Sequence, residues 1–153
     1  MLTNTWYLSD DDWFAQLPEA PRLSDHGQTV IGELTTLFDD EARFDPAGTV
    51  AATRVLLLAV ENLGDIMTYA AEGHDLTELA RLLCGLNLAQ AHLTQTVQRI
   101  CGHVNRRAFT GLPAAPTAVV QALTDSLSTA GANGEVLAGH LKEAHLILRT
   151  LAA

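Results

Sequence analysis

A heptad pattern in the second half of the chain constrains its fold more than any other feature. Apolar side chains there are separated alternately by four and three residues, as in helices that pack along one seam. The members of this leucine seam are Leu79, Leu83, Leu86, Gln90, Leu93, Val97, Ile100 and Val104. The pattern predicts a helix over residues 75–106 that packs against a neighbour along this seam. Gln90 is its polar exception, and an amide at such a position typically fixes register or oligomeric state.

Capping signals and helical periodicity predict further helices on either side of this one. Asp45 is a suitable N-cap and Pro46 suits a first helical turn. Gly131 and Gly134 predict that the last helical segment is either kinked or split in two. The three further helical segments are predicted at residues 24–43, 46–72 and 114–152.

The segments together predict an all-α fold. The sequence has no alternation typical of strands, and its links are short, which favours antiparallel neighbours. We therefore predict an antiparallel four- to five-helix bundle with a short N-terminal helical arm. Residues 1–23 are predicted to be the arm and a linker, and residues 24–153 a single helical-bundle domain.

The predicted arm combines large aromatic side chains with a run of aspartates. Trp6, Tyr7, Trp13 and Phe14 lie beside residues 10–12, which are all Asp. Trp and Tyr are frequent anchors of protein interfaces. We expect these four aromatic residues to dock on the bundle or on a second copy of the chain.

The predicted second helix is apolar around much of its circumference. Residues 55–60 read Val-Leu-Leu-Leu-Ala-Val, which leaves little polar face. A surface of this kind is typically covered by a partner. We therefore predict a homodimer, with Leu57 and Leu58 among its interface residues.

The two cysteines and two histidines of residues 84–103 do not predict a metal or redox site. Cys84 and Cys101 are about 25 Å apart along a helix, beyond disulfide reach. His92 and His103 share the polar face and are about 16 Å apart, too far to bind one ion. The leucine seam predicts that Cys101 points into the core and that Cys84 is the more accessible thiol.

The sequence predicts no catalytic, metal or cofactor site. It contains no His-Glu-x-x-His, no Cys-x-x-Cys and no phosphate-binding glycine loop. His140 and His145 flank Glu143 but differ by about 140° around a helix, so they cannot bind one ion together. Two cysteines in a chain with no secretory signal favour a reducing compartment, and we predict a cytoplasmic location.

The net charge of −9 disfavours binding to nucleic acid or to anionic membranes. The basic residues Arg99, Arg106 and Arg107 cluster near the end of the helix at 75–106. Cations at a helix C-terminus complement the helix dipole, which explains this cluster without a ligand. The longest apolar run is interrupted by polar and charged residues, so no membrane span is predicted.

These observations predict a non-catalytic interaction module that binds itself and a protein partner as a regulatory or accessory protein. One alternative is a small-ligand sensor or enzyme with a pocket between the helices at 46–72 and 75–106. Its lining would be Asn62, Tyr69, Asn87 and Gln90, which could instead form a buried polar layer. The second alternative is a DNA-associated regulator that uses Arg99, Arg106 and Arg107.

Overall fold

The computed structural model describes Leu8 and residues 24–40 and 44–151. Every regular element in these ranges is helical, which confirms the predicted all-α class. The α-helices are α2 (Asp25–Phe38), α3 (Pro46–Tyr69), α4 (Leu76–Asn105) and α5 (Thr117–Leu151), with 3₁₀ turns η2 (Ala71–Gly73) and η3 (Leu112–Ala114). None of the described helices is long and apolar enough to cross a membrane.

The described residues fall into two compact units. One unit contains Leu8 and residues 76–151, and therefore α4 and α5. The other contains residues 24–40 and 44–75, and therefore α2 and α3. The division into an arm at 1–23 and a single domain at 24–153 stays a prediction.

Side-chain caps explain where α2 and α3 begin. The Ser24 hydroxyl accepts a hydrogen bond of 3.1 Å from the Gly27 N–H at the start of α2. At the start of α3, Asp45 Oδ1 accepts a bond of 2.7 Å from the Gly48 N–H, and Pro46 occupies the first turn. The predicted cap at Asp45 is therefore confirmed, and both caps bind N–H groups that have no partner within the helix.

The helix ends differ from the predicted ones. α2 ends at Phe38, before the expected residue 43. α3 ends at Tyr69, before the expected residue 72, and there the Ala70 N–H donates to the Ile66 carbonyl. The chain instead tightens into η2, whose 3₁₀ bonds satisfy the next N–H groups.

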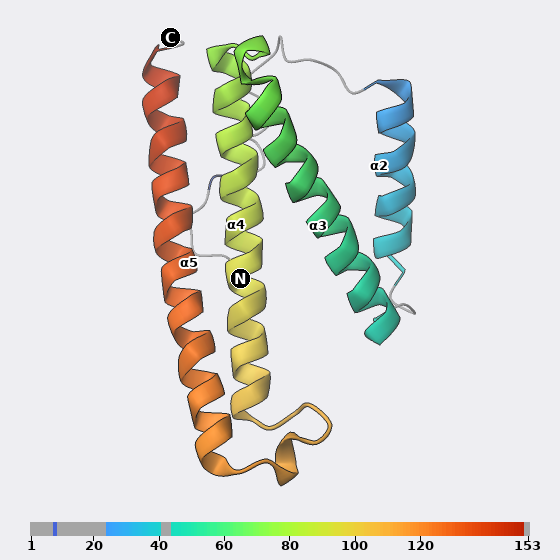
Figure 1. The fold of residues 1–153 in the computed structure, drawn as a ribbon, viewed down its shortest axis with the longest axis vertical. Coiled ribbons are helices and arrows are strands. Elements are labelled where there is room, and N and C mark those ends of the chain that lie inside the picture. The colour runs from blue at the N-terminus through green and yellow to red at the C-terminus, as the bar shows by residue number, and fades with distance from the viewer. Residues whose placement is uncertain (1–7, 9–23, 41–43, 152–153) are drawn as a thin grey trace. The chain divides into compact units, whose positions relative to one another are not determined.

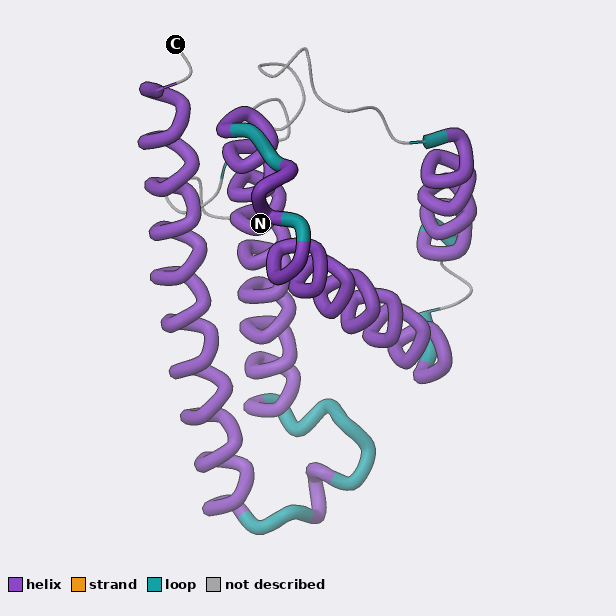
Figure 2. The backbone as a smooth tube through the Cα atoms, turned by 45° about the horizontal axis from the view of Figure 1, so that its top comes forward, coloured by secondary structure: helices purple, strands orange, loops and turns teal. Residues whose placement is uncertain are grey.

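α5 is one continuous helix of 35 residues, so Gly131 and Gly134 do not split it. It runs antiparallel beside α4 in both views of the backbone (Figure 1, Figure 2). Glycine costs about 1 kcal/mol in a helix interior relative to alanine. Close contact with α4 at both glycines offsets this cost.

The loop between α4 and α5 is held by Arg107. This residue has a positive φ of 54°, and Gly111 further along has a φ of 90°. The Arg107 guanidinium donates hydrogen bonds of 3.0–3.3 Å to three carbonyl oxygens and to the Thr117 hydroxyl. The carbonyls are those of Leu112, Pro113 and Ala115. Arg107 therefore stabilises the turn that reverses the chain, and residues 76–151 are called the hairpin from here on.

Candidate functional site

The hairpin buries a stripe of small and polar residues of α4. This small-residue seam comprises Ala80, Cys84, Asn87, Ala91 and Thr94. Its members are separated alternately by four and three residues, as predicted for the leucine seam. Each member, however, is the residue directly after a member of the leucine seam. The helix is therefore rotated by about 100° from the predicted orientation. The prediction chose the larger apolar side chains, whereas α5 packs against the smaller ones along most of α4. Val104, the last member of the leucine seam, is buried as predicted.

The matching stripe of α5 has the same spacing. Its buried members are Val120, Gly131, Ala138 and His145. Small residues on both helices allow the two backbones to approach closely. At the closest points, a Cβ added to Gly131 would lie 3.1 Å from Gln98 Cγ, and one added to Gly134 would overlap Thr94 Oγ1.

Three hydrogen bonds from side chains to backbone carbonyls cross between the helices. Asn87 Nδ2 donates to the Ala138 carbonyl at 2.7 Å, and Cys101 Sγ donates to the Thr124 carbonyl at 3.4 Å. The ring Nδ1 of His145 lies 2.7 Å from the Ala80 carbonyl. All three bonds fit one alignment of the two helices. The bonded residues are separated by 7 and 14 positions along α4 and by the same numbers along α5. A slip of either helix by one turn would break all of them.

Asn87 also ties the N-terminal segment to the hairpin. Its side chain is fully buried, and its Oδ1 accepts a bond of 2.7 Å from the N–H of Leu8, which is itself buried. The amide therefore accepts from one segment and donates to α5. The Asn87 side chain is engaged by the protein's own backbone, which leaves little of it to bind a ligand.

His145 is the largest fully buried side chain of the hairpin. Since its Nδ1 contacts a carbonyl oxygen, Nδ1 must carry the proton and donate it. Nε2 is buried and has no hydrogen-bond partner among the described residues. An imidazole with Nδ1 protonated makes the bond to Ala80 without any charge.

The predicted pocket residues are not all in similar environments. Asn62 is exposed on α3, and Tyr69 at the end of that helix is 85% exposed. Gln90 is partly buried on α4, where its Nε2 donates to the Thr94 hydroxyl at 3.1 Å. Asn87 is thus the buried amide of this set. The roles of Thr94 and His145 were not predicted, although both residues lie on stripes with heptad spacing.

The predicted interface residues Leu57 and Leu58 are exposed on α3. Trp6, Tyr7, Trp13 and Phe14 lie outside the described residues. Docking of these aromatic residues stays a prediction.

The prediction for the two thiols was wrong because the phase of α4 was wrong. Cys84 is 0% exposed in the small-residue seam, whereas Cys101 is half-buried nearer the loop. Neither cysteine is in a disulfide. We now expect a thiol reagent to modify Cys101 at least about tenfold faster than Cys84 in the native protein, because Cys84 reacts only after local opening. Mass spectrometry of labelled peptides measures both rates, and faster labelling of Cys84 would contradict the observed helix phase.

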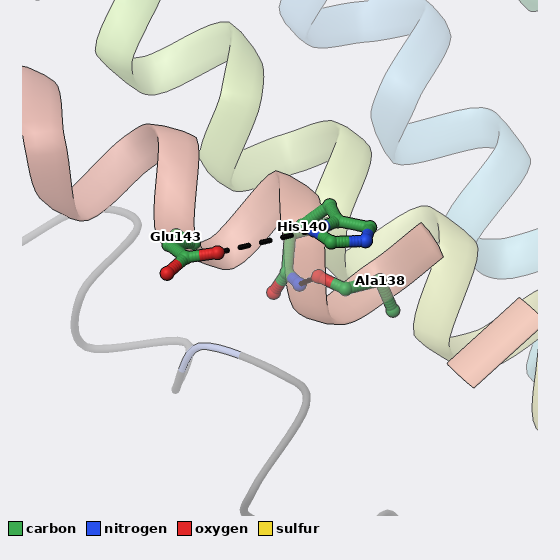
Figure 3. A network of polar contacts seen from close by, with 4 residues as sticks. Ala138, His140 and Glu143 are labelled. Carbon is green, nitrogen blue, oxygen red and sulfur yellow. Dashed lines mark hydrogen bonds and ion pairs between the residues drawn. The ribbon is translucent and has the colours of Figure 1, made fainter. Parts of the chain in front are cut away.

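No group of three or more metal-ligating side chains occurs among the described residues. His92 and His103 are exposed, as predicted. His140 Nδ1 and Glu143 Oε2 are 3.9 Å apart on the surface of α5, and Figure 3 shows this pair beside Ala138. His145 lies apart from that pair because it is buried against α4.

Comparison with known proteins finds no matching family, no matching curated protein and no matching solved structure.

Proposed function

We propose that this chain is a non-catalytic helical interaction module that binds a protein partner in a regulatory or accessory role. One observation carries the proposal: large apolar side chains lie exposed on the helices, while smaller ones fill the hairpin seam. On α3 they are Val50, Leu56, Leu57, Leu58, Val60 and Ile66. Exposed apolar side chains that gather on one element mark interaction sites.

The polar groups of the hairpin support the same proposal. The Asn87 amide and the His145 ring bind backbone groups of the protein itself. Such bonds hold a helix pair in one register, as polar seam residues do in coiled coils. The hairpin would then be the rigid part of an antiparallel bundle of four to five helices.

The two alternatives gain less support. The pocket hypothesis relies on Asn87, whose side chain is already engaged, and on Tyr69, which is exposed. The DNA hypothesis relies on Arg107, whose guanidinium is engaged by the loop. The two cysteines outside disulfides support the proposal of a cytoplasmic location.

The proposal is tested by affinity purification of the tagged full chain from its native host. We expect a protein to be retained by the wild type and lost, by at least about tenfold, from a variant with Leu57→Glu and Leu58→Glu, because a charge at the centre of an interface is costly to desolvate. A variant with Thr29→Glu and Thr36→Glu adds the same charge at exposed positions of α2 instead of α3, and should retain the partner. Equal capture by all three proteins, together with a co-purified small molecule that raises the melting temperature, would favour the sensor alternative instead.

A further inference from the structure

Most of the exposed large apolar side chains of α4 and α5 lie on one side of the hairpin, and Val136 and Leu146 on α5 are the exceptions. On α4 they belong to the leucine seam, in which Leu79, Leu93 and Ile100 each keep more than a third of their surface exposed. On α5 they are Val119, Leu123, Leu137, Ile147 and Leu151. The small-residue seam of α4 and the matching stripe of α5, both continued at heptad spacing, are together called the buried stripe. Each of the residues just named lies one position before a position of this buried stripe. In an antiparallel pair a step of one residue turns both helices toward the same side, so these residues form one apolar side of the hairpin.

The charged residues of the hairpin helices lie on the opposite side. Apart from Glu143, every Asp, Glu, Lys and Arg of α4 and α5 follows a position of the buried stripe by one residue. Examples are Arg81 and Arg99 on α4 and Glu135 and Lys142 on α5. The apolar side therefore carries no Asp, Glu, Lys or Arg along either helix, although the whole chain has a net charge of −9. His140, which precedes a stripe position, is the histidine on this side and is exposed beside Glu143.

The apolar side has the area of a stable protein interface. α4 has 30 residues and is therefore about 45 Å long, at 1.5 Å per residue. Two helices of roughly 10 Å width give a face of roughly 900 Å². Each partner of a standard specific interface contributes about 800 Å².

We propose that this side is the interface of a homodimer, in which the apolar sides of two copies pack face to face. The inference rests on the proposed function, since it names the chain itself as a partner of the module. Two chains of net charge −9 repel each other, and a side without charges is where they can meet at the least electrostatic cost. A two-fold axis places the same face of both copies in contact, which requires the face to complement itself.

The face has this self-complementarity. On α4 the apolar side is lined by large side chains, whereas the middle of α5 presents Ser126, Ala130 and Asn133. The large residues of one copy can therefore pack over the small residues of the other. Gln90 and Asn133 lie at the same level near the centre, because the hydrogen-bond register places residue 90 opposite residue 135. An amide pair at the centre of an apolar interface selects one register of association.

The test is sedimentation equilibrium of the purified full chain at about 50 µM, a concentration suited to specific association. We expect the wild type to have twice the chain mass of 16.4 kDa. Leu137→Glu should give a monomer, because it places a charge on the apolar side at a residue that is 49% exposed in one copy. Val136→Glu is the matched control. Val136 is the neighbour of Leu137 and is 60% exposed, but it lies off the apolar side, so this variant should remain a dimer. Ile147→Glu is a second dissociating variant in case Leu137→Glu does not fold.

Three results would overturn the inference: a monomeric wild type, dimers of both Leu137→Glu and Ile147→Glu, or dissociation by Val136→Glu as well. If the wild type is a monomer because another segment of the chain covers the apolar side, Leu137→Glu should have a lower melting temperature than the wild type. Loss of a host partner from the α3 variants is measured separately. A monomeric chain that still captures a host partner would refute the homodimer and leave the proposed function standing. A dimeric chain that captures no host partner would support the homodimer and contradict the proposed binding of a partner protein.

Discussion

Gly134→Ala is expected to destabilise the protein by about 1–3 kcal/mol, the usual cost of overpacking a close contact. The new Cβ would overlap Thr94 Oγ1 and lie 3.2 Å from both Thr94 Cβ and Gln90 Nε2. Thr94 cannot easily move away, because its hydroxyl donates to the Gln90 carbonyl at 2.8 Å and accepts from the Gln90 amide. Urea unfolding followed by circular dichroism measures the change in the free energy of unfolding.

Gly139→Ala is the matched control in the same helix. A Cβ at this position meets nothing within 4 Å. The substitution should stabilise the protein by about 0.4–1 kcal/mol through the lower entropy of the unfolded chain. Opposite signs at the two glycines would confirm that proximity to α4 decides the outcome. Adding Thr94→Ala to Gly134→Ala should recover part of the loss, and strict additivity of the two changes would contradict the contact.

Asn87→Leu is expected to lower the free energy of unfolding by about 2–3 kcal/mol, although leucine has a similar size and is apolar. The substitution removes the acceptor of the buried Leu8 N–H, while the Ala138 carbonyl keeps its own helical bond. Hydrogen exchange of the Leu8 amide gives the specific signature, because this amide should be protected in the wild type and exchange rapidly in the variant.

Asn62→Ala is the control for this substitution. Asn62 is exposed on α3, and removal of its amide should change the stability by less than about 0.5 kcal/mol. A variant Asn87→Leu as stable as the wild type would show that the Leu8 N–H finds another acceptor, and the proposed link between the N-terminal segment and the hairpin would be lost.

The periodicity of the sequence predicted the existence of the helices better than their orientation. The helix over 75–106 was predicted to within a residue at each end, as α4 shows. Its seam was displaced by one residue, because α4 carries two stripes with identical heptad spacing. Choosing between them requires knowledge of the neighbour, and the glycines of α5 fit the smaller stripe. A comparison of side-chain size between the two stripes could have found the match.

Other features of the hairpin depend on contacts that are distant in sequence. The glycines were read as helix breakers, since their helix propensity is low and their packing role appears only beside α4. Arg107 was read as a helix-end charge, whereas it binds loop carbonyls up to eight residues ahead. The pairing of Asn87 with Leu8 spans 79 residues, and no local pattern indicates it.

The shared register of the three cross-helix bonds has a consequence for the order of folding. The partners are 23 residues apart for Cys101 and Thr124, 51 for Asn87 and Ala138, and 65 for His145 and Ala80. Closing the longest of these loops costs about 1 kcal/mol more chain entropy than closing the shortest. The contacts of the hairpin should therefore form first near the turn, which Arg107 stabilises, and then progressively away from it. The contact between His145 and Ala80 should form last.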